Sequence, residues 1–453
     1  MVKSGKEHTD KRVTEGSTAE EPTKAIVVVP VLIVRDRRQG EDAGTPRQSL
    51  APQAKLEEAM GLAEAIDLDI VHRDLFNLSV PRPATLIGAG KVEELARIVQ
   101  ETGAELVVVD HQLTPVQQRN LERELKAKVL DRTGLILEIF GRRARTKEGR
   151  LQVDLAHLEY QRGRLVRSWT HLERQRGGGG FMGGPGETQI EADRRLLQER
   201  ITRIKRELET VRRTRDLHRA KRRKVPFPIV ALVGYTNAGK STLFNRLTGA
   251  EVMAEDMLFA TLDPTLRRLV LPHGTVVILS DTVGFISDLP THLVAAFRAT
   301  LEEVVEADLI LHLRDISHPD TAAHAREVRE VLQSLGVDPS DSERVLEVWN
   351  KIDLLDPADR QRLLRDEAQQ TPPVAISAVT GEGIPHLLRI IEERISGALQ
   401  DVVLNVRPHQ LQHLDWIYRN GRVTSREDHE DGSVTIHIRA TETARREFER
   451  RLK

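Results

Sequence analysis

The sequence predicts an α/β fold in which a P-loop domain is joined to an N-terminal α/β domain, a helical hairpin and a small C-terminal α+β domain. Three observations predict it. Apolar runs of strand length alternate with helical patterns in two parts of the chain, a glycine-rich loop follows one of these runs, and two heptad patterns lie between the two parts. With 453 residues, the chain has room for roughly three domains with separate cores.

The composition excludes several classes of site. The chain contains no Cys, which excludes disulfides, thiolate metal sites and thiol catalysis and fits a reducing compartment, so we expect a cytoplasmic protein. The longest apolar run, residues 25–34, is shorter than the roughly 20 residues that span a bilayer, so we expect a buried strand and no membrane insertion. Residues 1–24 are polar and mixed in charge, which predicts a disordered tail.

Residues 25–140 predict the N-terminal α/β domain, because their apolar runs alternate with helical patterns as in a mostly parallel sheet. The glycine-rich segment 85–91 suits either a turn between a strand and a helix or a small anion site. It lacks the spacing of a phosphate loop and the hydroxyl that follows the Lys of such a loop, which favours the turn. The alternating segments are 25–34, 54–66, 70–75, 92–101, 106–110, 116–126 and 129–130.

Residues 141–224 form a basic block inside a chain of net charge −1. They contain 24 Lys and Arg against 11 Asp and Glu, a net charge of +13. Such a block favours a polyanionic partner, most often nucleic acid. The alternative is a solvated helical surface, since Arg-rich helices are common there.

Two heptad patterns within this block predict a pair of amphipathic helices with an apolar seam. The glycine-rich residues 177–186 separate them, which predicts an antiparallel hairpin with this loop at its tip. About two or three residues suffice for a helical turn. This loop has ten, so we favour a loop that contacts a partner through Phe181 and Met182 over a simple connector. The expected seam residues are Leu151, Leu155, Leu158, Leu165, Trp169, Leu172, Leu197, Ile201, Ile204, Leu208 and Val211.

Residues 225–398 open with the apolar strand 229–233 and predict a second α/β domain. Residues 399–453 predict the small α+β domain, in which we find no catalytic pattern. Its expected strands are 402–406, 421–425 and 433–440, and its expected helices are 410–418 and 441–452.

A complete phosphate-binding motif, G-x-x-x-x-G-K-[ST], follows the strand 229–233 and precedes a helix. In this motif the glycines let backbone N–H groups surround the β-phosphate, Lys240 contacts the β- and γ-phosphates, and the Ser241 hydroxyl is a ligand of Mg²⁺. The predicted phosphate-binding residues are Gly234, Tyr235, Thr236, Asn237, Ala238, Gly239, Lys240, Ser241 and Thr242.

The base is predicted by an N-K-x-D pattern at the end of an apolar strand, formed by Asn350, Lys351 and Asp353. The Asp353 carboxylate can accept hydrogen bonds from N1–H and from the exocyclic amine of guanine, and adenine offers neither donor. GTP and GDP are therefore the expected ligands. Ser377 and Ala378 follow a further strand and are expected to close over the base.

Two further segments are expected near the γ-phosphate and Mg²⁺. Asp281 ends an apolar strand and places a carboxylate near Mg²⁺, while Gly284 offers an N–H to the γ-phosphate. Lys240, Thr261 and Gly284 are the candidate catalytic residues, and Ser241 and Thr261 are the candidate metal ligands. The expected nucleotide-contacting residues of the two segments are Phe259, Ala260, Thr261, Leu262, Asp263, Asp281, Thr282, Val283 and Gly284.

The order of these motifs defines a P-loop GTPase domain, and GTP hydrolysis is the expected reaction. Phe285 follows Gly284 where many switch GTPases have a Gln that orients the attacking water. A phenyl ring cannot hydrogen-bond water, so we expect slow hydrolysis by the protein alone and acceleration by a partner or by another group.

Together these motifs resemble the HflX family of ribosome-associated GTPases, and the resemblance covers nearly everything from about residue 24 to residue 400. It supports Thr261 over Thr265 as the hydroxyl ligand of Mg²⁺. The matching segments are 149–158, 183–189, 234–242, 259–265, 281–285 and 315–320.

The resemblance implies a GTPase that binds the large ribosomal subunit through ribosomal RNA and splits stalled or idle ribosomes, notably in stress. It implies that the loop 177–186 approaches the peptidyl-transferase region. It also implies K⁺ as an accessory cation held by Asn237, although a purely structural loop Asn explains this residue equally well. We expect the protein to be a monomer.

Two other functions stay open at this point. One is an RNA-remodelling, RNA-modifying or RNA-binding protein regulated by its GTPase domain, since a basic hairpin also suits RNA. The sequence shows no second catalytic pattern, which argues against it. The other is a protein-binding signalling switch at membranes, for which one expects a lipidation signal or an amphipathic anchor that the sequence does not show.

Overall fold

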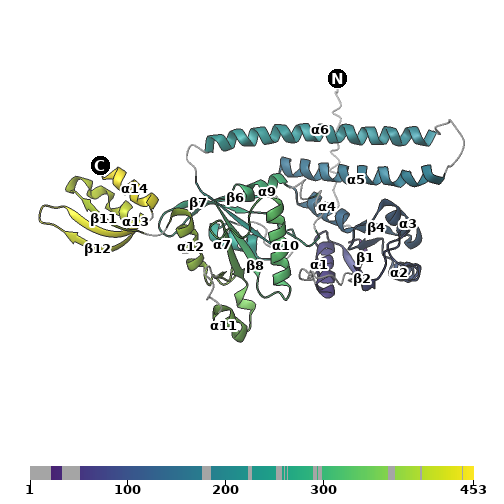
Figure 1. Ribbon diagram of the computed structural model, residues 1–453, viewed down its shortest axis with the longest axis horizontal. Helices are drawn as coiled ribbons and strands as arrows, with labels where there is room; N and C mark the ends of the chain where they lie inside the picture. The colour runs from purple at the N-terminus through teal and green to yellow at the C-terminus, as the bar shows by residue number, and fades with distance from the viewer. Residues whose placement is uncertain are drawn as a thin grey trace, which may run out of the picture.

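The structure is a computed structural model whose described residues form three β-sheets and two long helices (Figure 1). Most of the expected disordered tail, residues 176–184 of the hairpin tip, Ala260 and Asp263 lie outside the described residues. The described residues are 22–32, 51–175, 185–222, 227–250, 258–259, 261–262, 264–288, 293, 298–365, 373–397, 400–440 and 442–452.

The N-terminal domain has a parallel four-stranded sheet in the order β2-β1-β3-β4. Alternate residues of β1 face opposite sides, so that Val27 and Val29 join one apolar cluster and Ile26 and Val28 join another. Helices α1 and α4 cover the first side and α2 and α3 the second, because a parallel sheet must be buried on both faces. The elements are β1 (Lys24–Leu32), α1 (Pro52–Glu64), β2 (Asp69–Leu78), α2 (Ala89–Thr102), β3 (Leu106–Val109), α3 (Pro115–Leu125), β4 (Lys128–Asp131) and α4 (Arg132–Arg143).

The glycine-rich segment 85–91 forms a turn that leads into α2. Leu86 bridges back to Arg82, and Gly88 is the N-cap of α2. The Lys91 ammonium lies 2.7 Å from the Asp74 carboxylate and 3.0 Å from the Glu94 carboxylate. These ion pairs give Lys91 a structural role, which agrees with the turn that the sequence favours.

The hairpin consists of α5 (Lys147–Gln175) and α6 (Pro185–Arg222), which run side by side (Figure 1). On α6, Ile201, Ile204 and Leu208 are buried. On α5, Val153 and Ala156 are buried in the core of the N-terminal domain, and Figure 1 shows α5 between α6 and that domain. The first helix therefore packs on two sides, whereas the heptad pattern predicted a single seam. Its seam residues Leu151, Leu155, Leu158 and Leu165 are only half-buried.

The P-loop domain has a six-stranded sheet in the order β10-β9-β8-β5-β7-β6, parallel except for the β6–β7 pair. The carboxyl ends of β5, β7, β8 and β9 meet at one edge, where ligands of open α/β sheets bind. Its elements are β5 (Ile229–Gly234), α7 (Lys240–Thr248), β6 (Thr265–Val270), β7 (Val276–Asp281), α9 (Arg298–Val305), β8 (Leu309–Asp315), α10 (Thr321–Ser334), β9 (Val345–Asn350), η1 (Ile352–Leu354), α11 (Pro357–Arg365), β10 (Val374–Ala375) and α12 (Ile384–Ser396).

The C-terminal domain is an antiparallel three-stranded sheet in the order β11-β13-β12, with its own core around Phe448. The expected single helix 410–418 is wrong, because this stretch divides into a 3₁₀ helix and an α-helix. The Gln410 side chain holds the tight first part, accepting a hydrogen bond from Arg407 N and donating one to the Leu452 carbonyl. The elements are β11 (Gln400–Val406), η2 (Pro408–His413), α13 (Leu414–Asn420), β12 (Arg422–Asp428), β13 (Val434–Ala440) and α14 (Glu442–Arg451).

None of the helices within the described ranges combines the length and the apolar character that crossing a bilayer requires.

Candidate functional site

The phosphate loop connects the end of β5 to the first turn of α7. Gly239 has a φ of 91°, and a Cβ at this position would lie 2.2 Å from Asn350 Nδ2. Only glycine fits there, because both the backbone conformation and the space exclude a side chain. The loop is thereby held close to the end of β9.

The Lys240 side chain is buried beneath this loop. Its ammonium donates hydrogen bonds to the carbonyls of Gly234 (3.1 Å) and Tyr235 (2.8 Å). Burial lowers the pKa of Lys240 to about 8, and the charge of Asp281 opposes that shift only in part. A buried ammonium of this kind is stabilised by anionic groups, which fits the phosphates that the motif predicts.

Three oxygen atoms from three separate segments meet beside Lys240. Ser241 Oγ lies 2.8 Å from Asp281 Oδ2 and 2.9 Å from Thr261 Oγ1. Thr261 Oγ1 also lies 2.9 Å from Asp281 Oδ2. The other carboxylate oxygen, Asp281 Oδ1, is buried without a hydrogen-bond partner among the described residues. Hydroxyl and carboxylate oxygens are the ligands that Mg²⁺ prefers, so this donor set fits the metal that the sequence predicts.

Thr265 lies outside this group of oxygens. It begins β6 and pairs with Asp281 through the antiparallel ladder of β6 and β7. The structure thus brings Thr261, and not Thr265, to the oxygens of Ser241 and Asp281.

The segment 281–288, here called the switch segment, lies against the phosphate loop. Thr282 Oγ1 donates a 2.6 Å hydrogen bond to the Leu232 carbonyl. A Cβ at Gly284 would lie 2.9 Å from Thr236 Cγ2 and 3.1 Å from Lys240 Nζ, so this close backbone approach requires glycine.

Phe285 continues this contact through its backbone. Its carbonyl accepts a 2.7 Å hydrogen bond from Thr236 N, and its N–H donates to the Gly234 carbonyl at 3.1 Å. The phenyl ring is 1% exposed and packs in the apolar core. This position therefore offers no hydrogen-bonding side chain to the phosphate end of the site.

The opposite end of the site is organised by Asn350. Its Nδ2 donates to the Ala238 carbonyl at 2.8 Å, and its Oδ1 accepts from Ala378 N at 3.0 Å. Lys351 has a φ of 68°, and its ammonium lies 2.8 Å from the Asp315 carboxylate. Asp353 follows in η1 with an exposed side chain.

Ser377 is buried, and its hydroxyl accepts a 3.0 Å hydrogen bond from Thr380 N. It thus shapes the turn that presents the Ala378 backbone to Asn350.

Three residues expected at the nucleotide have side chains that lie in the apolar core. Phe259 and Leu262 are buried in the apolar cluster shared with the N-terminal domain, and the Phe259 ring meets the Phe140 ring of α4 edge to face at 4.8 Å. Val283 is buried in the same cluster. Contacts of these three residues with the nucleotide stay a prediction, and their buried side chains leave the backbone to make them.

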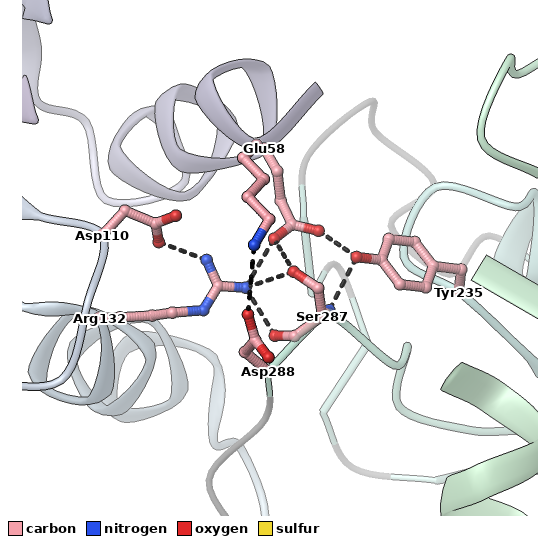
Figure 2. Close-up of polar contacts among 7 residues, drawn as sticks. Glu58, Asp110, Arg132, Tyr235, Ser287 and Asp288 are labelled. Carbon is pink, nitrogen blue, oxygen red and sulfur yellow. Dashed lines mark hydrogen bonds and ion pairs between the residues drawn. The ribbon is translucent and has the colours of Figure 1, made fainter. Parts of the chain in front are cut away.

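The sequence did not reveal a buried polar cluster next to the phosphate loop (Figure 2). It joins Glu58, Asp110 and Arg132 of the N-terminal domain to Tyr235 of the loop and Ser287 of the switch segment. The one local signal is that Glu58 lies on an otherwise apolar buried face of α1 and that the charged Arg132 is buried at the start of α4.

Four family descriptions match successive parts of the chain. The N-terminal domain matches the family described as GTP-binding GTPase N-terminal over residues 53–141, and the hairpin matches GTP-binding GTPase Middle Region over residues 143–222. The P-loop domain matches 50S ribosome-binding GTPase over residues 229–351, and the end of the chain matches HflX C-terminal domain over residues 363–453.

Whole-chain relatives agree with these domains. The chain is 52% identical over 380 residues to the GTPase HflX of Magnetococcus marinus, a match that covers 82% of this chain and 87% of the relative. The chain belongs to the HflX family of GTPases. It is also 46% identical over 384 residues to the GTPase HflX of Escherichia coli, covering 85% of this chain and 89% of that relative. As a member of this family, the protein binds GTP and hydrolyses it.

The family resemblance and the P-loop GTPase fold predicted from the sequence are therefore confirmed. Among solved structures, the chain is similar to a GTP-binding protein from the archaeon Sulfolobus solfataricus in complex with GDP. The TM-score is 0.43 at 23% identity, and the match covers 82% of this chain and 98% of that chain.

Proposed function

We propose that this HflX GTPase binds the large ribosomal subunit through ribosomal RNA and splits or recycles stalled or idle ribosomes under stress. The observation that carries the proposal is the basic hairpin. Helix α6 has 38 residues, about 57 Å at 1.5 Å per residue, and the block that contains it has a net charge of +13. A long basic element suits contacts with phosphates, which give affinity without reading bases.

The nucleotide site supports the following roles for hydrolysis. Lys240 neutralises the β- and γ-phosphates, the Gly284 N–H contacts the γ-phosphate, and Asp353 accepts hydrogen bonds from guanine. Ser241 and Thr261 would hold Mg²⁺ beside Asp281, as their 2.8–2.9 Å cluster of oxygens suggests. Bound there, Mg²⁺ would neutralise negative charge on the phosphates.

Hydrolysis is slow in the isolated protein in this proposal. The Phe285 ring is buried, so position 285 cannot orient the attacking water. Stimulation comes from the ribosome, and the protein acts as a monomer in the cytoplasm.

A K⁺ site at Asn237 is a further part of the proposal. Asn237 is exposed on the phosphate loop with a φ of 58°. Asn tolerates this left-handed conformation, which is also a sufficient structural reason for its presence. Hydrolysis measured in K⁺ and in Na⁺ decides between the two: a K⁺ preference that Asn237→Gly abolishes supports a ligand, and equal rates in both salts show a structural residue.

Co-sedimentation with purified 50S and 30S subunits, with GDP or with a non-hydrolysable GTP analogue, tests the proposed partner. We expect nucleotide-dependent binding to 50S subunits that weakens steeply as salt rises, because bound phosphates release counterions. Arg194→Glu with Arg200→Glu, two exposed positions of α6, should weaken binding strongly. The control pair Arg267→Glu with Arg389→Glu makes the same charge change on the GTPase domain. If both pairs weaken 50S binding equally, or if the affinity does not depend on salt, the basic surface of the hairpin is a solvated helical surface and not a binding site.

A further inference from the structure

The buried polar cluster joins the N-terminal domain to the GTPase domain (Figure 2). Its charged side chains come from α1, from the residue after β3 and from the first residue of α4. The side chain of Arg132 is 5% exposed, and those of Glu58 and Asp110 are each 7% exposed. Charges are this deeply buried only when partners compensate them.

Arg132 links both domains. Its guanidinium contacts Asp110 and Glu58 within the N-terminal domain, the latter at 2.6 Å. It also donates to the carbonyl of Ser287 at 2.7 Å and to the Ser287 hydroxyl at 3.0 Å. The guanidinium thus binds the backbone of the switch segment as well as its side chain.

Glu58 closes the network from the other side. Its Oε1 accepts a 2.5 Å hydrogen bond from the Ser287 hydroxyl, and its Oε2 accepts one from the Tyr235 hydroxyl. The Tyr235 oxygen in turn accepts a 2.7 Å hydrogen bond from Ser287 N. One carboxylate of the N-terminal domain therefore connects the phosphate loop with the switch segment.

Electrostatics favour the ionised Glu58–Arg132 pair. Burial alone raises the pKa of Glu58, but the Arg132 charge and hydrogen bonds from Ser287, Tyr235 and Arg132 outweigh it and lower the pKa. Burial acts to lower the pKa of Arg132, and the charges of Asp110 and Glu58 reverse that effect and raise it. The Tyr235 hydroxyl stays protonated, since burial and the Glu58 charge raise its pKa.

The network acts on residues next to the reacting phosphates. Ser287 lies three residues beyond Gly284, whose backbone meets Lys240 and Thr236. Tyr235 belongs to the phosphate loop, and its ring stacks on His324 of α10 at 3.8 Å. The network therefore lies within three residues of the Gly284 backbone, which is the predicted γ-phosphate contact.

The residue before Arg132 is bonded to the hairpin. Asp131 accepts hydrogen bonds from the Tyr160 hydroxyl at 2.5 Å and from Arg164 at 2.6 Å, both on α5. It also caps α4 through Gly134 N at 2.8 Å. Two adjacent residues at the β4–α4 junction, Asp131 and Arg132, thus bind the middle of α5 and the switch segment.

We propose that Glu58 and Arg132 are positioning residues for GTP hydrolysis, and that Asp131 couples them to the hairpin. They hold Ser287, and through it the Gly284 contact, against the phosphate loop. Displacement of α5 by an RNA partner moves the junction and changes the geometry of the switch segment. This coupling through Asp131 rests on the proposed ribosome-directed function. Thermodynamic linkage also requires the reverse effect, in which the bound nucleotide changes the affinity of the hairpin for RNA.

The positioning part is tested without ribosomes. Tyr235→Phe removes one hydroxyl from the network and keeps the ring, and we expect kcat to fall about tenfold while KM for GTP changes less than about twofold. Arg132→Lys keeps the positive charge but loses the planar guanidinium with its several N–H donors, so kcat should fall here too. The matched control for Tyr235→Phe is Tyr418→Phe, in the C-terminal domain. The matched control for Arg132→Lys is Arg142→Lys, because Arg142 lies on the same helix, α4, and forms an exposed ion pair with Asp67.

A spectroscopic readout separates positioning from general destabilisation. In Tyr235→Phe the Ser287 N–H loses its acceptor, so its amide hydrogen exchange should accelerate while exchange in β5 stays unchanged. If Arg132→Lys fails to fold, Tyr235→Phe alone tests the positioning role. A kcat and a Ser287 exchange rate equal to those of the controls would overturn the positioning role.

Tyr160→Phe tests the coupling part, because it removes one hairpin bond to Asp131. We expect the ratio of 50S-stimulated to basal kcat to fall about fivefold at saturating subunits. An unchanged ratio overturns the coupling. If the unmodified protein shows no stimulation by 50S subunits, the proposed function and the coupling both fail, and the ribosome-free kcat of Tyr235→Phe still decides the positioning role.

Discussion

At the scale of single residues, the nucleotide site is held together by side chains that join distant segments. Asn350 is the clearest case, since it bonds the Ala238 carbonyl and the Ala378 N–H. The N-K-x-D pattern predicted that Asn350 belongs to the site. It could not predict these bonds, because both partners are backbone groups of alanines and carry no signal in the sequence.

Ser241→Ala tests the proposed metal ligands. Losing one oxygen of the Ser241, Thr261 and Asp281 group should lower kcat by about a hundredfold, equivalent to about 2.7 kcal/mol of transition-state stabilisation. The variant should also need more Mg²⁺ for half-maximal hydrolysis, measured by phosphate release. Ser334→Ala, an exposed serine of α10, is the control. A normal Mg²⁺ requirement in Ser241→Ala would place the metal elsewhere.

Asp353→Asn tests whether the Asp353 carboxylate recognises guanine. Replacing the carboxylate should weaken GTP binding by about 1.5–3 kcal/mol, the usual worth of hydrogen bonds to a charged group. It should improve relative binding of xanthosine triphosphate, whose C2 carbonyl accepts from the new amide. Competition binding measures both, with Asp356→Asn as the neighbouring control. An unchanged preference for guanine would remove Asp353 from the base site.

Glu327 of α10 makes the stability pH-dependent. Burial, then repulsion by Glu58 and Asp288, raises the pKa of Glu327 to about 8, so folding favours the protonated carboxyl. Its stabilising contribution is complete below its ordinary pKa of 4.5 and is lost as pH rises through 8. Glu327→Gln should therefore be more stable than the unmodified protein at pH 9, by on the order of 1–3 kcal/mol, and similar at pH 5. Thermal unfolding checks this, with exposed Glu330→Gln as control; parallel pH profiles of Glu327→Gln and the unmodified protein would contradict it.

At the scale of elements, the sequence predicted the strands of the N-terminal sheet and the helices α1, α2 and α3. Helix α4 was missed. Its buried apolar residues Leu135, Ile136, Leu137, Ile139 and Phe140 form a short, almost continuous run, and periodicity does not tell whether such a run is a helix or a strand. The contacts of Asp131 and Arg132 were missed with it.

The hairpin tip, residues 177–186, is the element whose functional role is most open to direct test. Replacing it with a short Gly-Ser turn should leave guanine-nucleotide affinity unchanged, because the site lies in another domain. Ribosome splitting should be abolished or fall severely, since insertion of Phe181 or Met182 into RNA requires the tip itself. Sucrose-gradient analysis of 70S ribosomes measures the loss. A shortened protein that splits ribosomes at the normal rate would show the loop to be a connector.

At the scale of the whole molecule, one apolar cluster runs from the N-terminal domain into the GTPase domain. It includes Val27 and Ile136 on one side and Ala231, Val233 and Phe285 on the other. The fold class was predictable because each domain carries its own local pattern. This shared core was not, because contacts between segments more than a hundred residues apart leave no periodic pattern in the sequence. The C-terminal domain, by contrast, has a separate core.

In the proposed function, the ribosome controls the GTPase activity through the basic hairpin. The most direct measurement is the turnover number for GTP with and without purified 50S subunits. Because the buried Phe285 ring cannot orient water, we expect slow hydrolysis alone and marked acceleration by 50S subunits that high salt abolishes. Fast hydrolysis by the protein alone, unaltered by 50S subunits, would contradict control of the GTPase by the ribosome.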